Sequence, residues 1–352
     1  MVAMADPAGS TSTLIVVPGA HSMVALLGSS DELLQLIERS FSCDIHVRGN
    51  EITLSGDPTE VAVAARLFAE LMTLLERGEV LTPDAVQRSI TMLRDQTDVR
   101  PADVLSLNII SSRGRTIRPK TLNQKRYVDS IDANIIVFGI GPAGTGKTYL
   151  AMAKAVQALQ AKQVNRIILT RPAVEAGERL GFLPGTLNEK IDPYLRPLYD
   201  ALHDMIDPES IPRLMASGVI EVAPLAYMRG RTLNDSFIVL DEAQNTSAEQ
   251  MKMFLTRLGF GSKMVVTGDI TQVDLPTGTR SGLRIVQDIL DGIEDVSFCR
   301  LTSQDVVRHK LVSDIVDAYA KFDAESATTH AAAPHQQGSR QHASRRQSRP
   351  GR

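Results

Sequence analysis

The chain has 352 residues, of which 43% are hydrophobic, and a formal net charge of -3. This length is sufficient for two hydrophobic cores. It contains no Trp and only 4% aromatic residues, which argues against a platform on which bases stack, and its net charge excludes a protein that is basic throughout. With two cysteines, and without an apolar run of the roughly 18 residues that a membrane helix requires, we expect a cytoplasmic protein with reduced thiols.

The N-terminal part of the sequence predicts a small α+β unit. Residues 1–12 are small and polar, and we expect them to be disordered. Residues 13–80 combine the two periodicities of helices and strands. A first helix is predicted to begin at a capping box formed by Ser29 and Glu32.

A hairpin and a second long helix complete this unit. Residues 44–48 and 51–54 alternate apolar and polar side chains around Gly49-Asn50, a turn signal. Asp57-Pro58 supplies a cap and first residue for a helix that ends at Gly78. The order helix, hairpin, helix resembles the KH-type RNA-binding domain, whose GxxG loop clamps the nucleic-acid backbone.

The corresponding loop departs from the KH pattern. It would be Gly28-Ser29-Ser30-Asp31, in which Asp31 replaces the second glycine and would place a carboxylate opposite phosphate. Two interpretations of the unit stay open, RNA clamping and a role in docking or oligomerisation.

Residues 81–120 are predicted to form a helical arm and a basic linker. Thr82-Pro83-Asp84 begins a helix. Residues 113–126 then contain six Arg and Lys residues and no acidic one. This cluster is either a solvated connector or a contact for nucleic acid.

Residues 121–322 alternate strands with helices, which predicts a mostly parallel sheet covered on both faces. The expected strands are 135–138, 166–170, 219–222, 237–240, 264–267 and 296–299. In such sheets ligands bind at the carboxyl ends of the strands.

The first of these strands runs into a phosphate loop. The stretch Gly141-Pro142-Ala143-Gly144-Thr145-Gly146-Lys147-Thr148 fits the G-x-x-x-x-G-K-[ST] pattern, and a strand precedes it as the pattern requires. The backbone N–H groups of the loop can surround phosphate oxygens, while an exposed Lys147 neutralises them and Thr148 binds Mg²⁺.

Two acids follow the strand 237–240. Asp241 is placed to hold Mg²⁺ and Glu242 to activate the attacking water. Because Glu242 favours hydrolysis over transfer to an acceptor, a kinase is the weaker interpretation.

Two stretches, each of which contains a glutamine, resemble motifs of superfamily 1 helicases. Gly268-Asp269-x-x-Gln272 resembles their motif III, in which the glutamine senses the γ-phosphate. The stretch Asn123-Gln124 resembles the segment in which those helicases read adenine. This resemblance implies ATP as the nucleotide, with Gln124 at the base and Gln272 at the γ-phosphate.

A helicase of that superfamily has two cores and supplies its arginine finger from the second. This chain is long enough for one such core. The finger would then come from elsewhere, with Arg308 as the first choice and Arg229 or Arg231 as alternatives. Arg171 and Glu175 follow the second strand, where they can border a nucleic-acid path or pair with each other.

Residues 323–352 are predicted to be a disordered tail, with five arginines and no acid after Glu325. Without this +5, the remaining chain has a formal charge of about -8. A basic tail of this kind favours a polyanionic partner.

Several stretches together resemble the PhoH family of bacterial phosphate-starvation-inducible, helicase-like ATPases. They are Asn123-Gln124, Gly141 to Thr148, Thr170 to Glu178, Leu180 to Gly185, Asp241 to Asn245 and Gly268 to Pro276. The resemblance implies a RecA-like P-loop NTPase core with an N-terminal KH-like domain. It also implies a cytoplasmic ATPase of RNA metabolism, a homo-oligomeric ring such as a hexamer, and association with an endoribonuclease of ribosomal RNA maturation. The alternative is a slow nucleotide-dependent switch or scaffold that recruits the nuclease.

Overall fold

The computed structural model describes residues 2–5, 10–19, 22–95, 99–112, 115–172, 187–276 and 278–307. Residues 1–307 form one compact unit. The predicted tail lies outside the described residues. Within the described ranges, every helix is too short or too polar to cross a lipid bilayer.

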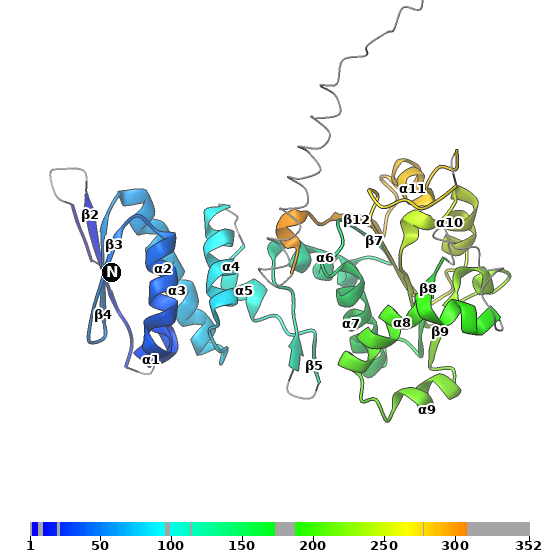
Figure 1. Cartoon of the computed structure of the whole chain (residues 1–352), viewed down its shortest axis with the longest axis horizontal. Helices are drawn as coiled ribbons and strands as arrows, with labels where there is room; N and C mark the ends of the chain where they lie inside the picture. The colour runs from blue at the N-terminus through cyan, green and yellow to red at the C-terminus, as the bar shows by residue number, and fades with distance from the viewer. Residues whose placement is uncertain are drawn as a thin grey trace, which may run out of the picture. The chain divides into compact units, whose positions relative to one another are not determined.

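The N-terminal part is an antiparallel sheet with helices on one side (Figure 1). The strands are β1 (Val2–Ala5), β2 (Thr11–Val16), β3 (Asp44–Arg48) and β4 (Glu51–Gly56), in the order β1-β2-β4-β3. The helices are α1 (Met23–Leu27), α2 (Glu32–Ser40) and α3 (Pro58–Glu76). The predicted hairpin is confirmed, with Ile45 opposite Leu54 and both side chains buried. The expectation of disorder over residues 1–12 is wrong for Val2–Ala5, which pair with β2.

The predicted capping box at Ser29 and Glu32 is also wrong. Ser29–Asp31 form a single 3-10 turn, η1, between α1 and α2, and neither helix has a side-chain cap. Ser30 and Asp31 have φ of 59° and 58°, so the chain turns here rather than entering a helix. The five residues of α1 are too few for their periodicity to be recognised in the sequence. Gly28 to Asp31 thus connect two helices, in a unit whose order from β2 onward is β-α-α-β-β-α.

The third helix begins and ends where the sequence predicts. The Asp57 carboxylate accepts hydrogen bonds from the N–H groups of Thr59 (2.9 Å) and Glu60 (3.2 Å), and Pro58 occupies the first turn. Gly78, with φ of 79°, lies two residues beyond the last helical residue.

The helical arm shares a core with the α+β unit. The arm contains α4 (Pro83–Arg94) and α5 (Pro101–Leu105), and one hydrophobic cluster continues from Ile15 to Leu105. Thr82 caps α4 as expected. A boundary near residue 80 would therefore cut through a shared core, and the predicted division into domains stays a prediction.

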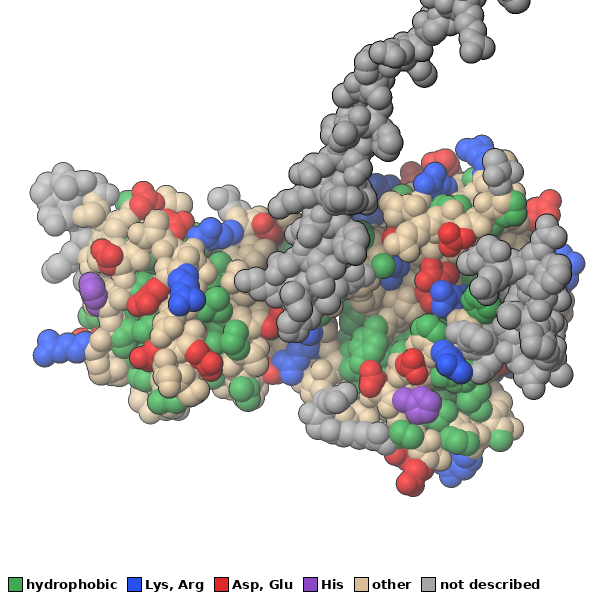
Figure 2. Space-filling model, viewed as in Figure 1, with side chains coloured by type: hydrophobic (Ala, Val, Ile, Leu, Met, Phe, Trp, Pro, Cys, Tyr) green, Lys and Arg blue, Asp and Glu red, His purple; other side chains and the backbone are tan. Residues whose placement is uncertain are grey.

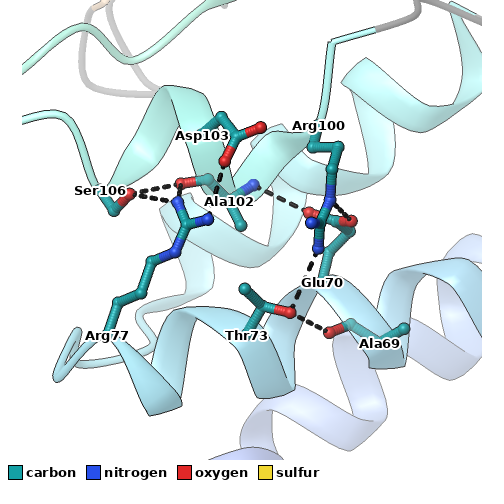
Figure 3. A network of polar contacts seen from close by, with 8 residues as sticks. All are labelled: Ala69, Glu70, Thr73, Arg77, Arg100, Ala102, Asp103 and Ser106. Atoms are coloured by element: carbon teal, nitrogen blue, oxygen red, sulfur yellow. Dashed lines mark hydrogen bonds and ion pairs between the residues drawn. The ribbon is translucent and has the colours of Figure 1, made fainter.

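A polar network fastens α3 to α5 (Figure 3). The buried Glu70 accepts hydrogen bonds from Arg100 Nε (2.8 Å) and from the N–H of Ala102 (3.0 Å). Arg77 donates to Asp103 (2.8 Å) and to the carbonyl oxygen of Ala102 (3.0 Å). The bonds to Glu70 satisfy a carboxylate and the Ala102 N–H, which packing has removed from water, whereas the pair of Arg77 and Asp103 is exposed.

The predicted basic linker is largely structured. It contributes to the hairpin of β5 (Ile110–Ser112) and β6 (Arg115–Ile117) and to α6 (Leu122–Ala133). Arg118 pairs with Glu79, and Lys125 pairs with Asp129 at 2.6 Å. Arg118 is thus paired with an acid that is distant in the sequence, whereas Lys125 has a partner on its own helix. Contact of this basic cluster with nucleic acid stays a prediction.

The second part of the chain is built on a parallel six-stranded sheet. Its strands are β7 (Ile136–Ile140), β8 (Arg166–Arg171), β9 (Ile220–Pro224), β10 (Ser236–Leu240), β11 (Lys263–Gly268) and β12 (Val296–Arg300), in the order β12-β7-β11-β10-β8-β9. Its helices are α7 (Lys147–Gln160), α8 (Leu187–Met205), α9 (Ile211–Ala216), α10 (Ala248–Leu255) and α11 (Gly282–Leu290), with the short 3-10 helices η3 (Leu225–Met228), η4 (Ala243–Asn245) and η5 (Ser303–Asp305). All six predicted strands are confirmed to within two residues.

Alternate residues of each strand face opposite layers, so the sheet is buried on both sides. Val239 belongs to the cluster under α6, α7 and α8, whereas its neighbour Leu240 belongs to the cluster under α10 and α11. Figure 1 shows α7 and α8 on one side of the sheet and α10 and α11 on the other. On the face shown in Figure 2, basic and acidic side chains are interspersed over the described surface.

Candidate functional site

The phosphate loop connects β7 to α7, and close packing shapes it. Gly146, with φ of 78°, directly precedes α7, which begins at Lys147 as predicted. A Cβ at Gly141 would lie 2.5 Å from the carbonyl oxygen of Leu301, so only glycine fits there. The loop is further held by the N–H of Val307, which donates to the carbonyl oxygen of Gly144 (3.0 Å).

Lys147 is half-buried, and the expectation that it is exposed is wrong. Its Nζ donates to the carbonyl oxygen of Pro142 at 3.1 Å. Burial lowers the pKa of Lys147 from its ordinary value, and the nearby carboxylates of Asp269, Asp241 and Glu242 partly oppose this shift. The charged amine is thus disfavoured here, and an anionic phosphate beside it would stabilise the charged form.

Three oxygen ligands converge next to the loop. Thr148 Oγ1 donates to Asp241 Oδ1 at 2.6 Å, and Thr267 Oγ1 donates to the same oxygen at 2.9 Å. The two hydroxyl oxygens are 3.2 Å apart. In the described residues, no group of three or more His, Cys, Asp or Glu side chains could hold a metal alone. One carboxylate with hydroxyls fits Mg²⁺, which takes its other ligands from water and substrate phosphates.

Glu242 has a left-handed backbone, with φ of 52°, directly after β10. Its two carboxylate oxygens have different partners: Oε1 forms an ion pair with Arg171 Nη2 at 3.2 Å, and Oε2 accepts a hydrogen bond from Gln244 Nε2 at 2.5 Å. Gln244 Oε1 in turn accepts from the N–H of Asp269 at 3.0 Å. The side chain that follows Asp241 is thus held from two sides.

The structure brings Gln244 into this network, whereas Gln272, which is predicted to lie at the γ-phosphate, is not part of it. Gln244 is 1% exposed, whereas Gln272 is exposed and its backbone N–H donates to the carbonyl oxygen of Asp269. The sequence reasoning missed Gln244 and Thr267. The position of Gln244 two residues after Glu242 is a signal that could have found it. The role of Gln272 at the γ-phosphate stays a prediction.

Gln124 lies behind the phosphate loop. Its Nε2 donates to the carbonyl oxygens of Thr145 (2.9 Å) and Asp305 (3.3 Å), and its Oε1 accepts from the N–H of Lys120 (2.7 Å). A cavity of about 570 Å³ adjoins it and is lined by Ile117, Arg118, Gly144, Gly146, Tyr149 and Val307, among others. The cavity has room for a nucleoside beside the loop, while reading of adenine by the Gln124 amide stays a prediction.

The structure describes some of the candidates for the arginine finger and not others. Arg308 and Glu175 lie outside the described residues. Arg231 is held by Glu221 through two bonds of 2.6 and 2.7 Å, and Arg229 is exposed. Arg171, to which the sequence assigned no catalytic role, is the arginine that contacts Glu242.

The loop, the lysine, the oxygen ligands and the adjacent carboxylate form the arrangement of a P-loop nucleotide-binding site. Comparison with known structures gives the Sulfolobus solfataricus SWI2/SNF2 ATPase core in complex with dsDNA, with a TM-score of 0.29, 14% identity, and coverage of 51% of this chain and 43% of that one. This similarity is too low to carry an argument.

The sequence relatives are much more similar. A PhoH-like protein of Mycobacterium tuberculosis (strain ATCC 25618 / H37Rv) is 69% identical over 318 residues, which cover 90% of each chain. A PhoH-like protein of Bacillus subtilis (strain 168) is 51% identical over 85% of this chain and 94% of its own length. Protein PhoH of Escherichia coli (strain K12) is 42% identical over 66% of this chain and 62% of its own length. The family model described as PhoH-like protein matches residues 116–320, the region that contains the phosphate loop and both acids, and so this chain belongs to the PhoH-like family.

Proposed function

We propose that this chain binds ATP with Mg²⁺ and hydrolyses it to ADP and phosphate, in connection with RNA metabolism in the cytoplasm. The observation that carries the proposal is the 2.6 Å contact between Thr148 Oγ1 and Asp241 Oδ1, with Glu242 as the next residue. A hydroxyl of the phosphate loop, the carboxylate proposed to hold Mg²⁺ and the proposed base thus follow β7 and β10, the two strands that flank β11, at the carboxyl edge of the sheet, which supports the proposal.

Each residue then has a defined task. The backbone N–H groups of the loop and Lys147 bind the phosphates, and Lys147 exchanges its bond to Pro142 for phosphate oxygens. Thr148 and Asp241 would hold Mg²⁺, which neutralises phosphate charge when bound. The Glu242 carboxylate orients the attacking water and accepts its proton.

The connection with RNA rests on three features of this chain. From β2 onward the N-terminal unit has the order β-α-α-β-β-α, with its Gly28 to Asp31 turn between the two consecutive helices. Basic residues cluster over 113–126, and the tail carries five arginines. The resemblance to the family adds a homo-oligomeric ring and an endoribonuclease of ribosomal RNA maturation as partners.

An arginine from a neighbouring subunit is proposed to complete the site, with Arg308 as the first choice. Loss of such a finger typically costs about 10³-fold or more in rate. Mixing Glu242→Gln subunits with Arg308→Ala subunits tests this, because a shared site regains activity in the mixed ring. Mixed assemblies that exchange subunits without recovering activity would exclude the trans assignment.

The second candidate is a slow nucleotide-dependent switch that recruits a nuclease. The engagement of both Glu242 oxygens by Arg171 and Gln244 favours it, since a restrained base slows turnover. Phosphate release measured with and without RNA separates the two candidates. An RNA-stimulated ATPase should turn over many ATP molecules per chain, and a switch should release about one equivalent.

Deletion of residues 326–352 tests the contribution of the tail to RNA binding. Fewer cationic contacts should weaken binding and flatten its dependence on the logarithm of salt concentration. If affinity and slope both stay unchanged, the tail is not a binding arm.

A further inference from the structure

Arg171 joins three elements of the core at its carboxyl edge. It is the last residue of β8, which pairs with β10 so that Thr170 lies opposite Leu240. Its Nη2 lies 3.2 Å from Glu242 Oε1, and its Nη1 donates to the carbonyl oxygen of Tyr194 in α8 at 3.0 Å. The guanidinium therefore links the candidate base to α8.

The strand order determines in which direction the ion pair with Arg171 draws the Glu242 carboxylate. The phosphate loop follows β7, and the order across the sheet is β7-β11-β10-β8. Arg171 at the end of β8 thus lies beyond β10 as seen from β7, since neighbouring strands are about 4.8 Å apart. An ion pair with Arg171 draws Glu242 towards β8 and away from Lys147 and Thr148.

Gln244 opposes this pull from the other side. Its Nε2 donates to Glu242 Oε2, and its Oε1 accepts from the N–H of Asp269, which follows β11. β11 lies between β10 and β7. The carboxylate is therefore shared between a neutral amide on the side of the phosphate loop and a cation on the far side.

The Arg171 side chain is 20% exposed, so its charge is not sealed in the core. A guanidinium binds a phosphate with the same paired geometry as a carboxylate. An RNA phosphate that reaches Arg171 can replace Glu242 as its partner without leaving the cation unpaired. Release of Arg171 would leave Glu242 with Gln244 as its remaining partner among the described residues, on the side where water must be activated.

We propose that Arg171 is a positioning residue that couples RNA to hydrolysis: it restrains Glu242 in the absence of RNA and releases it when a backbone phosphate of single-stranded RNA pairs with the guanidinium. This inference rests on the proposed ATPase function and names the regulation of that site. It assigns to Arg171 a contact with RNA and an effect on rate that acts through Glu242.

The test compares Arg171→Gln with Arg166→Gln in the full chain. Arg166 begins the same strand, and its Nε donates to Ser236 Oγ at 2.8 Å at the opposite edge of the sheet. Both substitutions remove one positive charge from β8, and only Arg171→Gln frees Glu242. ATP hydrolysis at saturating ATP is measured alone, with oligouridylate and with polyglutamate, a polyanion without phosphate.

Arg171→Gln is expected to raise the RNA-free kcat about fivefold with little change in KM, a factor equivalent to about 1 kcal/mol and to the upper range of partly exposed ion pairs. Oligouridylate should stimulate the wild type and Arg166→Gln but add nothing to Arg171→Gln. Arg171→Lys, which keeps the charge, should restore part of the restraint. Polyglutamate should leave all the rates unchanged.

A lower or unchanged RNA-free kcat in Arg171→Gln overturns the proposal, as does stimulation by polyglutamate in place of oligouridylate. RNA affinity without nucleotide is an independent readout. Losing one phosphate contact should reduce the slope of log affinity against log salt by about 1 in Arg171→Gln relative to Arg166→Gln. If the wild type hydrolyses no ATP under any condition, the ATPase proposal fails, while an unchanged slope contradicts the role of Arg171 separately.

Discussion

Two polar networks among the described residues have similar partners but differ in their surroundings. In one, Glu70 of α3 is bonded to Arg100 and to the N–H of Ala102, as Figure 3 shows. In the other, Glu242 is bonded to Arg171 and Gln244. Each is a carboxylate held by an arginine and an amide N–H group, so composition and pairing alone do not distinguish a structural network from a functional one.

The difference lies in what surrounds each carboxylate. Glu70 sits in a regular helix, and its partners close the junction between α3 and α5. Glu242 has a left-handed backbone, and the neighbouring Asp269 has an Oδ2 that is buried without a partner within the described structure. The nearby Lys147 has a lowered pKa. Strain, an unsatisfied oxygen and a destabilised charge mark the second network as one built to accept a ligand.

The substitution Lys147→Ala is expected to have the largest effect and tests whether the second network binds a ligand. If the second network exists to bind phosphate, removing the amine should weaken ATP binding by roughly 10²- to 10⁴-fold, the sum of two charge-assisted hydrogen bonds, while the fold persists. Nucleotide titration alongside circular dichroism measures both. Unchanged ATP binding by a folded variant would remove the phosphate-loop assignment.

Glu242→Gln separates binding from chemistry within the same network. The amide keeps the shape of the side chain but cannot accept the proton, so turnover should fall roughly 10²- to 10⁴-fold while ATP affinity is retained. Single-turnover phosphate release together with titration measures the two quantities. A variant that still turns over at the wild-type rate would show that another group is the base.

Glu70→Ala should show the opposite behaviour. It leaves the N–H of Ala102 buried without its acceptor, which should cost about 1 to 3 kcal/mol of unfolding free energy in urea denaturation. ATP turnover should not change. Asp84→Ala is the control, since it removes an i,i+4 pair with Arg88 whose carboxylate is 58% exposed and should cost about 0.5 kcal/mol or less. Equal losses in the two variants would contradict a structural role for Glu70.

The smallest expected effect is a pH dependence that belongs to the second network. Because the pKa of Lys147 is lowered in the folded protein, its protonated form costs stability at neutral pH, and the cost is relieved as pH rises through the folded pKa towards 10.5. Bound phosphate favours the protonated amine, so ATP affinity should fall over the same rise in pH.

Lys147→Arg stays charged throughout this range, and its ATP affinity should not show the fall. Lys263, whose pKa burial also lowers, lies at the other edge of the sheet and donates to the carbonyl oxygen of Asp132 (3.0 Å). Lys263→Met should leave the pH dependence of ATP affinity intact. A fall that persists in Lys147→Arg would assign it to another group.

Local pattern was sufficient for much of the fold and part of the site. The six strands, the start of α7 and the cap at Asp57 follow from periodicity and from residues adjacent in sequence. The convergence of Thr148 and Asp241 follows from parallel topology, because the carboxyl ends of all the strands meet at one edge.

Contacts between distant segments could not be predicted in the same way. Arg118 looks unpaired in sequence because its partner Glu79 lies 39 positions away. The pairing of Arg171 with Glu242 depends on strand order and on a left-handed residue at the end of β10. Ser29 fits the capping-box pattern, but the chain turns at Ser30 and Asp31 and no cap forms.

The segment after β12 contacts the phosphate loop, and this contact determines how long a fragment must be to bind nucleotide. Val307 donates to Gly144, and the buried Asp305 accepts from Thr121 (2.6 Å) and Asn123 (3.0 Å) at the start of α6. A protein truncated after Arg300 would keep all six strands of the sheet and lose this fastening. Recombinant fragments and protease-resistant cores that retain nucleotide binding should therefore extend to Val307 at least, and the sheet alone is not the minimal unit.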